Sequence, residues 1–326
     1  MIRLAIIGTS KIAATFAQAA KRCGGYSLEA VYSRGEATGR AFAQEHGIAA
    51  AVDSLEKLGA MEQVDAVYIA SPNSCHYGQA MAMLRAKKHV LLEKPAVPRA
   101  EAFAELREEA NRQGVVFLEA MRTAFDPGIE TIERLMGQIG PVRRATLEYS
   151  QYSSRYDAFK RGEILNAFNP ALANAAVMDI GVYAVYALIR LFGEPEEIRG
   201  ASVFLENGME GLGTILARYP GMVGEVLYSK ITDMAQDSQI QGEQGSLLVD
   251  HIASPGRIVL RPRKGEEQVF VLEKDSNPLY DEAEAFCRIV ETGAFEEMRT
   301  HQSRTLAQLR VIQELRRQSG IRFPGE

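Results

Sequence analysis

The tripeptide Glu93-Lys94-Pro95 combines residue types that could do chemistry at the end of a strand. It follows the apolar run 88–92, which predicts a buried parallel strand that the charged pair and the proline end abruptly. Open α/β sheets bind ligands just outside the carboxyl ends of their strands. A lysine at this edge can project into a cleft, where a cofactor or desolvation can tune its pKa. The same tripeptide also fits a plain strand end with a solvated ion pair.

A second pair of chemically capable side chains, Asp179 and Tyr183, lies in the apolar stretch 177–186. Their spacing of four places them on one face of a predicted helix. Gly181 between them weakens the helix but lets another group approach the backbone closely. A buried acid and a buried phenol at these positions would need polar partners. The alternative is an aspartate that interacts favourably with the helix dipole and an interfacial tyrosine.

The segment Gly8-Thr9-Ser10-Lys11-Ile12-Ala13 joins a predicted strand over 3–7 to a predicted helix over 14–22. Backbone N–H groups and the dipole at such a helix N-terminus suit a pyrophosphate. In the dinucleotide fingerprint G-x-G-x-x-G/A, Ser10 occupies the position of the middle glycine. Its Cβ leaves a ligand less room to approach the backbone than glycine does. Glycine at a strand–helix turn is also ordinary turn chemistry, but a second strand at the proper distance favours a cofactor site.

That second strand is predicted over 27–32 and ends at Ser33-Arg34. A cofactor with a free ribose 2′-hydroxyl usually meets a carboxylate at this strand end, whereas an arginine accommodates a 2′-phosphate. Because positions 32–34 contain no carboxylate, we expect NADP, with NAD possible. The alternative is that Arg34 is a solvated loop residue.

Helical and extended patterns alternate over the first 120 residues, with further strands predicted over 48–52, 65–70 and 115–120. Regular alternation with short connections predicts right-handed βαβ units and a parallel sheet. Ser71-Pro72-Asn73 leaves a strand at the same sheet edge as Gly8 and Lys94, so Asn73 and His76 could reach the nicotinamide half of a cofactor. Alternatively, Asn73 or Ser74 caps the helix, and His76 is a first-turn histidine whose hydrogen bonds are satisfied within the protein.

The pattern changes after residue 122, where alternating polar and apolar residues predict many half-buried antiparallel strands. Tyr219-Pro220-Gly221-Met222 predicts the turn of a hairpin between two of them. We therefore expect a dinucleotide-binding domain over 1–122 and an α+β domain for substrate binding and oligomerisation over 123–326. The second domain should contain one large, mostly antiparallel sheet with an open face. Because that face must be covered, we expect a second copy of the chain to pack on it in a homodimer or homotetramer.

Composition excludes several other classes of protein. The 326 residues are 46% hydrophobic and 24% charged, as in ordinary soluble proteins, and long enough for two domains. The net charge of -5 without a basic block argues against nucleic-acid binding. With no signal peptide and no apolar run near 18 residues, we expect a cytoplasmic protein without membrane spans. Cys23, Cys75 and Cys287 lack metal-ligand spacing and predict free thiols, with no metal site.

The order and spacing of three motifs resemble the Gfo/Idh/MocA oxidoreductase family: the segment 8–13, then Ser71-Pro72-Asn73-x-x-His76, then Glu93-Lys94-Pro95. The resemblance implies a doubly wound Rossmann fold, a Lys94-Pro95 peptide that is commonly cis, and Lys94 beside the nicotinamide at the substrate carbon. Asp179-x-Gly181-x-Tyr183 is similar to the family's second hallmark. Tyrosine at its last position, with the segment 152–157, most resembles the NADP-dependent trans-1,2-dihydrodiol dehydrogenase-like branch. The expected cofactor contacts are Gly8, Thr9, Ser10, Lys11, Ile12, Ser33, Arg34, Ser71, Asn73, His76, Glu93 and Lys94.

The predicted reaction is hydride transfer between the nicotinamide and a secondary alcohol or carbonyl of a sugar, polyol or cyclic diol. Tyr183 would take the hydroxyl proton, helped by the Lys94 cation, which favours the phenolate. Asp179 would orient the substrate or Lys94, while Arg122 and Tyr156 would contact the substrate. Two alternatives remain: a non-catalytic NADP-binding sensor or regulator on the same fold, and a reductase of a carbonyl or imine-like substrate.

Overall fold

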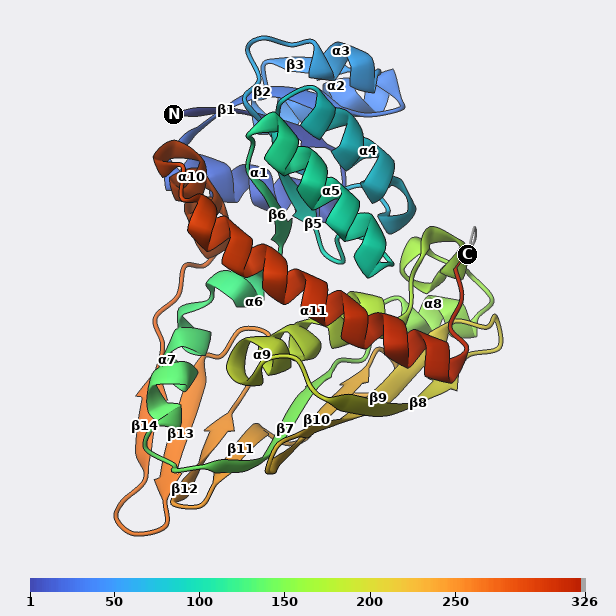
Figure 1. Cartoon of the computed structure of the whole chain (residues 1–326). Coiled ribbons are helices and arrows are strands. Elements are labelled where there is room, and N and C mark those ends of the chain that lie inside the picture. Colours follow the sequence, from blue (N-terminus) through green and yellow to red (C-terminus); the bar gives the residue numbers. More distant parts are fainter. Residues whose placement is uncertain (324–326) are drawn as a thin grey trace. The chain divides into compact units, whose positions relative to one another are not determined.

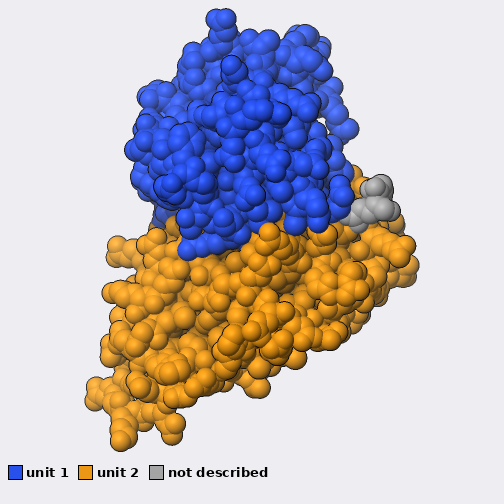
Figure 2. Space-filling view, viewed as in Figure 1, with its two compact units in different colours: residues 1–122, 275–306 blue, residues 123–274, 307–326 orange. Residues whose placement is uncertain are grey.

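The computed structural model describes residues 1–323, which divide into two compact units (Figure 2). Unit 1 comprises residues 1–122 and 275–306. Unit 2 comprises residues 123–274 and the C-terminal residues from Ala307. The return of the chain to unit 1 after residue 274 matters for function, because it adds a helix to the dinucleotide-binding fold.

Unit 1 contains a parallel six-stranded sheet in the order β3-β2-β1-β4-β5-β6 (Figure 1). Its central strands β1 and β4 are mostly apolar and almost wholly buried, because helices cover both faces of a parallel sheet. This confirms the predicted doubly wound Rossmann sheet. The strands are β1 Ile2–Ile7, β2 Tyr26–Tyr32, β3 Ala50–Val52, β4 Ala66–Ile69, β5 His89–Glu93 and β6 Phe117–Ala120.

The strand order reverses between β1 and β4, and right-handed crossovers in opposite directions place their helices on opposite faces. Helices α4 and α5 lie side by side on one face, while α1 packs against α10 (Figure 1). A crevice forms at such a reversal, outside the carboxyl ends of the strands. The helices are α1 Lys11–Cys23, α2 Glu36–His46, α3 Leu55–Gly59, α4 Asn73–Arg85, α5 Ala100–Gln113 and α10 Tyr280–Thr292.

Unit 2 contains an eight-stranded sheet in the order β14-β13-β12-β11-β7-β10-β9-β8. Every pairing is antiparallel except that of β7 with β10, which confirms the predicted mostly antiparallel sheet. Tyr219 pairs with Met222, so the predicted hairpin is present, and Gly221 supplies its positive φ of 73°. The strands are β7 Val142–Ser150, β8 Glu197–Phe204, β9 Glu210–Tyr219, β10 Met222–Ser229, β11 Ser238–Gly242, β12 Gly245–Val249, β13 Arg257–Pro262 and β14 Gln268–Val271.

One face of this sheet is covered by α9 and by a single π-helical turn, Val177–Gly181, which contact β7 and β10 (Figure 1). The other face is open, and alternate residues of β9 are exposed, including Leu216 at 48%. The remaining helices are α6 Arg122–Phe125, α7 Pro127–Met136, α8 Tyr156–Lys160, α9 Val182–Phe192 and α11 Phe295–Ser319, with short 3-10 turns at Asn166–Phe168 and Pro170–Leu172. Among residues 1–323, no helix combines the length and the apolar character needed to cross a membrane.

Candidate active site

The turn between β1 and α1 is built for close approach of a ligand to the backbone. Gly8 has a φ of 109°, and a Cβ on it would lie 2.7 Å from the Ala70 carbonyl oxygen. Ser10 is the N-cap of α1, since its Oγ accepts a hydrogen bond from the Ala13 N–H at 3.4 Å. The serine that replaces the middle glycine of the fingerprint therefore has a capping role. The start of α1, at Lys11 and Ile12, keeps the N-terminal backbone groups that suit a pyrophosphate.

A fully buried histidine connects the loops that follow β4 and β5. His76 Nδ1 lies 3.1 Å from the Pro95 oxygen and 3.2 Å from the Ala96 oxygen, while Nε2 lies 3.0 Å from the Ser71 oxygen. Burial lowers the pKa of His76, although these backbone contacts oppose the shift. His76 thus joins the Ser71 turn to the backbone just after Lys94. Asn73 is the first residue of α4, whose N-cap is Pro72.

Lys94 follows directly on β5, and its peptide bond to Pro95 is cis, as the family resemblance implied. Glu93 is only 7% exposed, so the solvated ion pair that the sequence also allowed is not formed. Its carboxylate accepts hydrogen bonds from the Tyr68 hydroxyl and, at 3.1 Å, from the Lys94 N–H. Burial raises the pKa of Glu93, and the Lys94 charge and these hydrogen bonds oppose the rise. Glu93 therefore fixes the backbone from which Lys94 projects.

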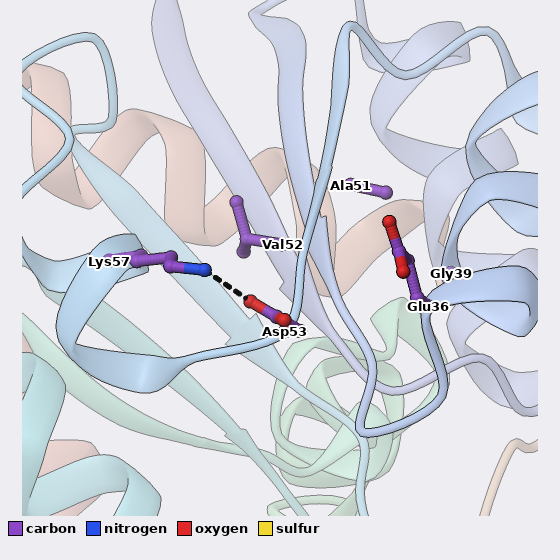
Figure 3. Close-up of a pocket in the computed structure, with 6 residues that line it drawn as sticks. All are labelled: Glu36, Gly39, Ala51, Val52, Asp53 and Lys57. Atoms are coloured by element: carbon purple, nitrogen blue, oxygen red, sulfur yellow. Dashed lines mark hydrogen bonds and ion pairs between the residues drawn. The ribbon is translucent and has the colours of Figure 1, made fainter.

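The predicted adenosine end of the site adjoins a small pocket at the ends of β2 and β3 (Figure 3). Ser33 Oγ accepts from the Gly35 N–H at 3.3 Å and so shapes the turn that carries Arg34. The sequence reading missed two carboxylates here, because Glu36 and Asp53 lie outside positions 32–34. Each already has a cation: Glu36 pairs with Arg40, and Asp53 pairs with Lys57 at 2.8 Å. The pocket is lined by Glu36, Gly39, Ala51, Val52, Asp53 and Lys57.

In unit 2, Asp179 lies on the π-helical turn and Tyr183 lies on the first turn of α9, so the predicted single helix begins with a π turn. Lys230, just after β10, pairs with Asp179 at 2.8 Å (Nζ to Oδ2) and donates to the Ala167 oxygen at 2.6 Å. The Lys230 side chain is 3% exposed, whereas that of Asp179 is 41% exposed. A buried cation therefore holds a carboxylate that still faces solvent. The only sequence cue to Lys230 is a lysine that ends an apolar strand, as Lys94 does.

The buried carboxylate of Glu210 also fixes the π turn. The Glu210 carboxylate accepts from the Val177 N–H at 2.8 Å, the Tyr228 hydroxyl at 2.6 Å and the Ser202 hydroxyl at 2.8 Å. Burial raises the pKa of Glu210, and these three donors oppose the rise. A Cβ on Gly181 would lie only 2.8 Å from Cγ of Tyr228, so the Tyr228 ring leaves no room for a side chain at this position. The close approach predicted at Gly181 is therefore that of an aromatic ring.

The other predicted substrate residues have distinct surroundings. Tyr156 stacks on Phe168 at 5.6 Å between ring centroids, and Lys230 Nζ lies 4.8 Å from the centroid of the same Phe168 ring. The structure thus brings Tyr156 and the Asp179–Lys230 pair into one neighbourhood of unit 2. The Tyr183 ring lies 5.7 Å from that of Tyr149. Arg122 belongs to unit 1, where its charge acts on buried carboxyls.

Known proteins match the chain along its whole length. The oxidoreductase family model with an NAD-binding Rossmann fold (GFO_IDH_MocA) matches residues 2–121, and a GFO/IDH/MocA C-terminal domain model matches residues 134–248. The chain is 38% identical over 326 residues to scyllo-inositol 2-dehydrogenase (NADP(+)) IolU of Bacillus subtilis (strain 168), covering 100% of this chain and 99% of that protein. It is 28% identical over 313 residues to human trans-1,2-dihydrobenzene-1,2-diol dehydrogenase, covering 92% and 90%.

A solved structure agrees with these sequence matches. KijD10, a 3-ketoreductase from Actinomadura kijaniata in complex with NADP and TDP-benzene, matches with a TM-score of 0.85 over 99% of this chain and 98% of that chain. At 22% identity this likeness establishes the fold alone. The sequence matches confirm the resemblance inferred from the motifs, including the similarity to dihydrodiol dehydrogenases. The chain belongs to the Gfo/Idh/MocA family of oxidoreductases, and residues 2–121 are its NAD(P)-binding Rossmann domain.

Proposed function

We propose that the protein is an NADP-dependent dehydrogenase or reductase that acts on the CH–OH group of a sugar, polyol or cyclic diol. The observation that carries this proposal is the full-length match to an NADP-dependent scyllo-inositol dehydrogenase. In addition, Glu93 fixes the backbone of Lys94, and Lys230 forms an ion pair with Asp179. The relatives reported above are named as enzymes, so the non-catalytic sensor is not favoured.

We further propose a division of labour along the chain. Residues 1–122 bind the cofactor, and residues 123–326 bind the substrate and form the subunit interface. At the Gly8 turn a Cβ would meet the Ala70 backbone, and the absence of a side chain there suits a pyrophosphate bound at the start of α1. Arg34 would hold the 2′-phosphate, beside carboxylates that already have their own cations. When bound, NADP supplies the group that accepts or returns the hydride.

The proton chemistry is assigned to the chain's own residues. Tyr183 takes the substrate hydroxyl proton as the alcohol is oxidised and returns it in the reverse direction. Lys94 supplies the positive charge that makes a phenolate accessible near neutral pH, since a free tyrosine has a pKa of about 10. Asp179, held by Lys230, accepts a hydrogen bond from a substrate hydroxyl and so orients the carbinol carbon. Arg122 and Tyr156 remain proposed substrate contacts.

The open face of the unit 2 sheet supports a proposed homodimer or homotetramer. Val203 is 50% exposed and Leu216 is 48% exposed on neighbouring strands. Apolar side chains on an uncovered sheet face favour burial by a second copy. Light scattering should therefore give a multiple of the 35.9 kDa chain mass. A monomer at micromolar concentration would contradict this assignment without affecting the proposed reaction.

The cofactor assignment is tested by thermal unfolding with NADP and with NAD, using wild type and Arg34→Ala. A cofactor present at 100 times its Kd stabilises the folded state by about 2.7 kcal/mol, enough to raise Tm by several degrees. Wild type should shift with NADP more than with NAD, and Arg34→Ala should lose most of the NADP shift while keeping the NAD shift.

A larger NAD shift in wild type would overturn the NADP preference and leave the oxidoreductase proposal intact. An unchanged NADP shift in Arg34→Ala would show that another residue contacts the 2′-phosphate. Activity is then measured as NADPH formation with scyllo-inositol and other cyclic polyols, and as NADPH consumption with the matching ketones. Absence of turnover with all of them, despite cofactor binding, would contradict the proposed substrate class.

A further inference from the structure

Helix α10 places an unexplained carboxyl in the core of unit 1. Glu282 is 1% exposed, and within residues 1–323 neither of its carboxyl oxygens has a hydrogen-bond partner. A buried carboxylate without partners is strongly disfavoured, so such a group either holds a proton or is compensated by nearby charge. No sequence pattern marks this residue, because acids are common in the first turn of a helix.

The groups around Glu282 connect it to the strand end that carries Lys94. The charges that act on its carboxyl are those of Glu93, Arg122, Asp281 and Lys94. Glu119, also buried on β6, is engaged by the Ala96 N–H and the Thr305 hydroxyl. Helix α1, which packs against α10, carries three charged residues, Lys11, Lys21 and Arg22, and all three are exposed. Glu119 thus has its own donors, and the buried carboxyls of Glu93 and Glu282 are left to interact with the charges of Lys94 and Arg122.

The two carboxyls are not equivalent. Burial raises the pKa of Glu282 well above its ordinary value, and the Glu93 charge acts in the same direction. Burial also raises the pKa of Glu93, but the Lys94 charge, the Tyr68 hydroxyl and the Lys94 N–H all favour its charged form. When one proton is shared between two close carboxyls, it resides on the one whose ionised form is less well solvated. Here that carboxyl is Glu282.

We propose that Glu282 is a positioning residue for Lys94, forming with Glu93 a buried carboxyl pair that retains one proton and presents a single negative charge to the Lys94 ammonium. This inference rests on the role proposed for Lys94. A protonated carboxyl can donate a hydrogen bond, which removes the need for a cation partner at Glu282. With Glu282 neutral, the negative charge that this pair contributes to Lys94 and Arg122 is that of Glu93.

The test measures the reactivity of Lys94 toward trace acetic anhydride in wild type, Glu282→Gln and the double variant Glu93→Gln/Glu282→Gln. Peptide mass spectrometry gives the acetylation rate of Lys94 relative to that of exposed Lys264 in the same chain. Glu282→Gln removes the carboxyl that holds the proton and leaves the charge on Glu93, so the rate at about pH 8 should stay within about twofold of wild type. The double variant loses that charge, which favours the neutral amine, and the rate should rise about tenfold.

Acceleration by Glu282→Gln well beyond twofold would overturn the proposal, because Glu282 would then carry a negative charge in wild type. An unchanged rate in the double variant would overturn it too, since the pair would have no influence on Lys94. Neither readout uses turnover, so these outcomes are independent of whether the proposed reaction is correct.

A second measurement remains available if the double variant does not fold. Unfolded glutamate releases its proton near pH 4.3, whereas folded Glu282 retains it, so raising the pH disfavours folded wild type relative to Glu282→Gln. The ratio of the two folding equilibrium constants should change about tenfold per pH unit above about pH 5. Parallel stability curves for the two proteins would contradict a retained proton on Glu282.

Discussion

Lys94→Met is expected to lower kcat by about 10²- to 10⁴-fold, the usual contribution of a group that assists proton transfer. Lys94 leaves the carboxyl end of β5, where Glu93 and His76 fix the backbone on both sides of it. Methionine keeps the length of the side chain and removes the charge that we propose favours a Tyr183 phenolate. The turn at Gly8 and the start of α1 are unaffected, so NADP should still raise Tm by nearly the wild-type amount.

The matched control is Lys87→Met, which removes an exposed lysine near the start of the same strand. It should leave kcat within about twofold of wild type, as is usual for surface substitutions. Lys94→Arg separates two roles of the lysine. Arginine keeps the positive charge but does not release its proton, so activity retained in this variant supports an electrostatic role, whereas loss indicates proton transfer by Lys94 itself. A kcat of Lys94→Met close to that of wild type would contradict both roles.

Local patterns predicted the fold well because each pattern has a local physical cause. Runs such as 66–70 are apolar at successive positions because a parallel sheet is covered on both faces, and β4 Ala66–Ile69 is buried throughout. In β9, by contrast, exposed and buried residues alternate, which identifies a half-covered antiparallel sheet. Lys94 was predicted at a strand end from the residues around it alone, and it lies directly after β5.

The partners of the candidate site residues could not be predicted in this way. Lys230 meets Asp179, and Glu210 meets the Val177 N–H, through contacts between segments far apart in the chain. No periodicity connects such positions, and a lysine or glutamate in a strand pattern carries no mark of its eventual partner. The π turn was missed for a related reason, since a local apolar pattern does not distinguish α from π geometry. Glu282 was missed because its significance comes from its burial and from the Glu93 charge that acts on it.

Lys230→Met is expected to lower kcat/KM for the alcohol about 100-fold while leaving the Tm shift with NADP unchanged. Lys230 holds the Asp179 carboxylate at 2.8 Å and, through the Ala167 oxygen at 2.6 Å, the loop that carries Phe168. Loss of a positioned group that orients the substrate costs about this much, because small displacements of reacting atoms are amplified in the rate. Stability should fall by about 2 kcal/mol, since Asp179 is partly solvated and the Ala167 oxygen loses a charged donor.

Lys274→Met provides a control of similar chemistry within unit 2. Lys274 pairs with buried Asp126 at 2.6 Å and contacts Ser254 at 2.9 Å, on elements other than the π turn. It should lower Tm at least as much as Lys230→Met and leave kcat/KM nearly unchanged. If both variants lost activity in proportion to stability, the effect of Lys230 would be on folding alone.

A double-mutant cycle with Asp179→Asn decides whether Lys230 acts through Asp179. Residues in direct contact show interaction energies of about 0.5–3 kcal/mol, whereas independent residues have additive effects. If the ammonium acts only by holding the carboxylate, Asp179→Asn alone removes most of the activity, and adding Lys230→Met removes little more. Additive losses would instead mean that Lys230 acts through the Ala167 loop and the Phe168 ring. Tyr156, which stacks on Phe168, would then be the better candidate for orienting the substrate.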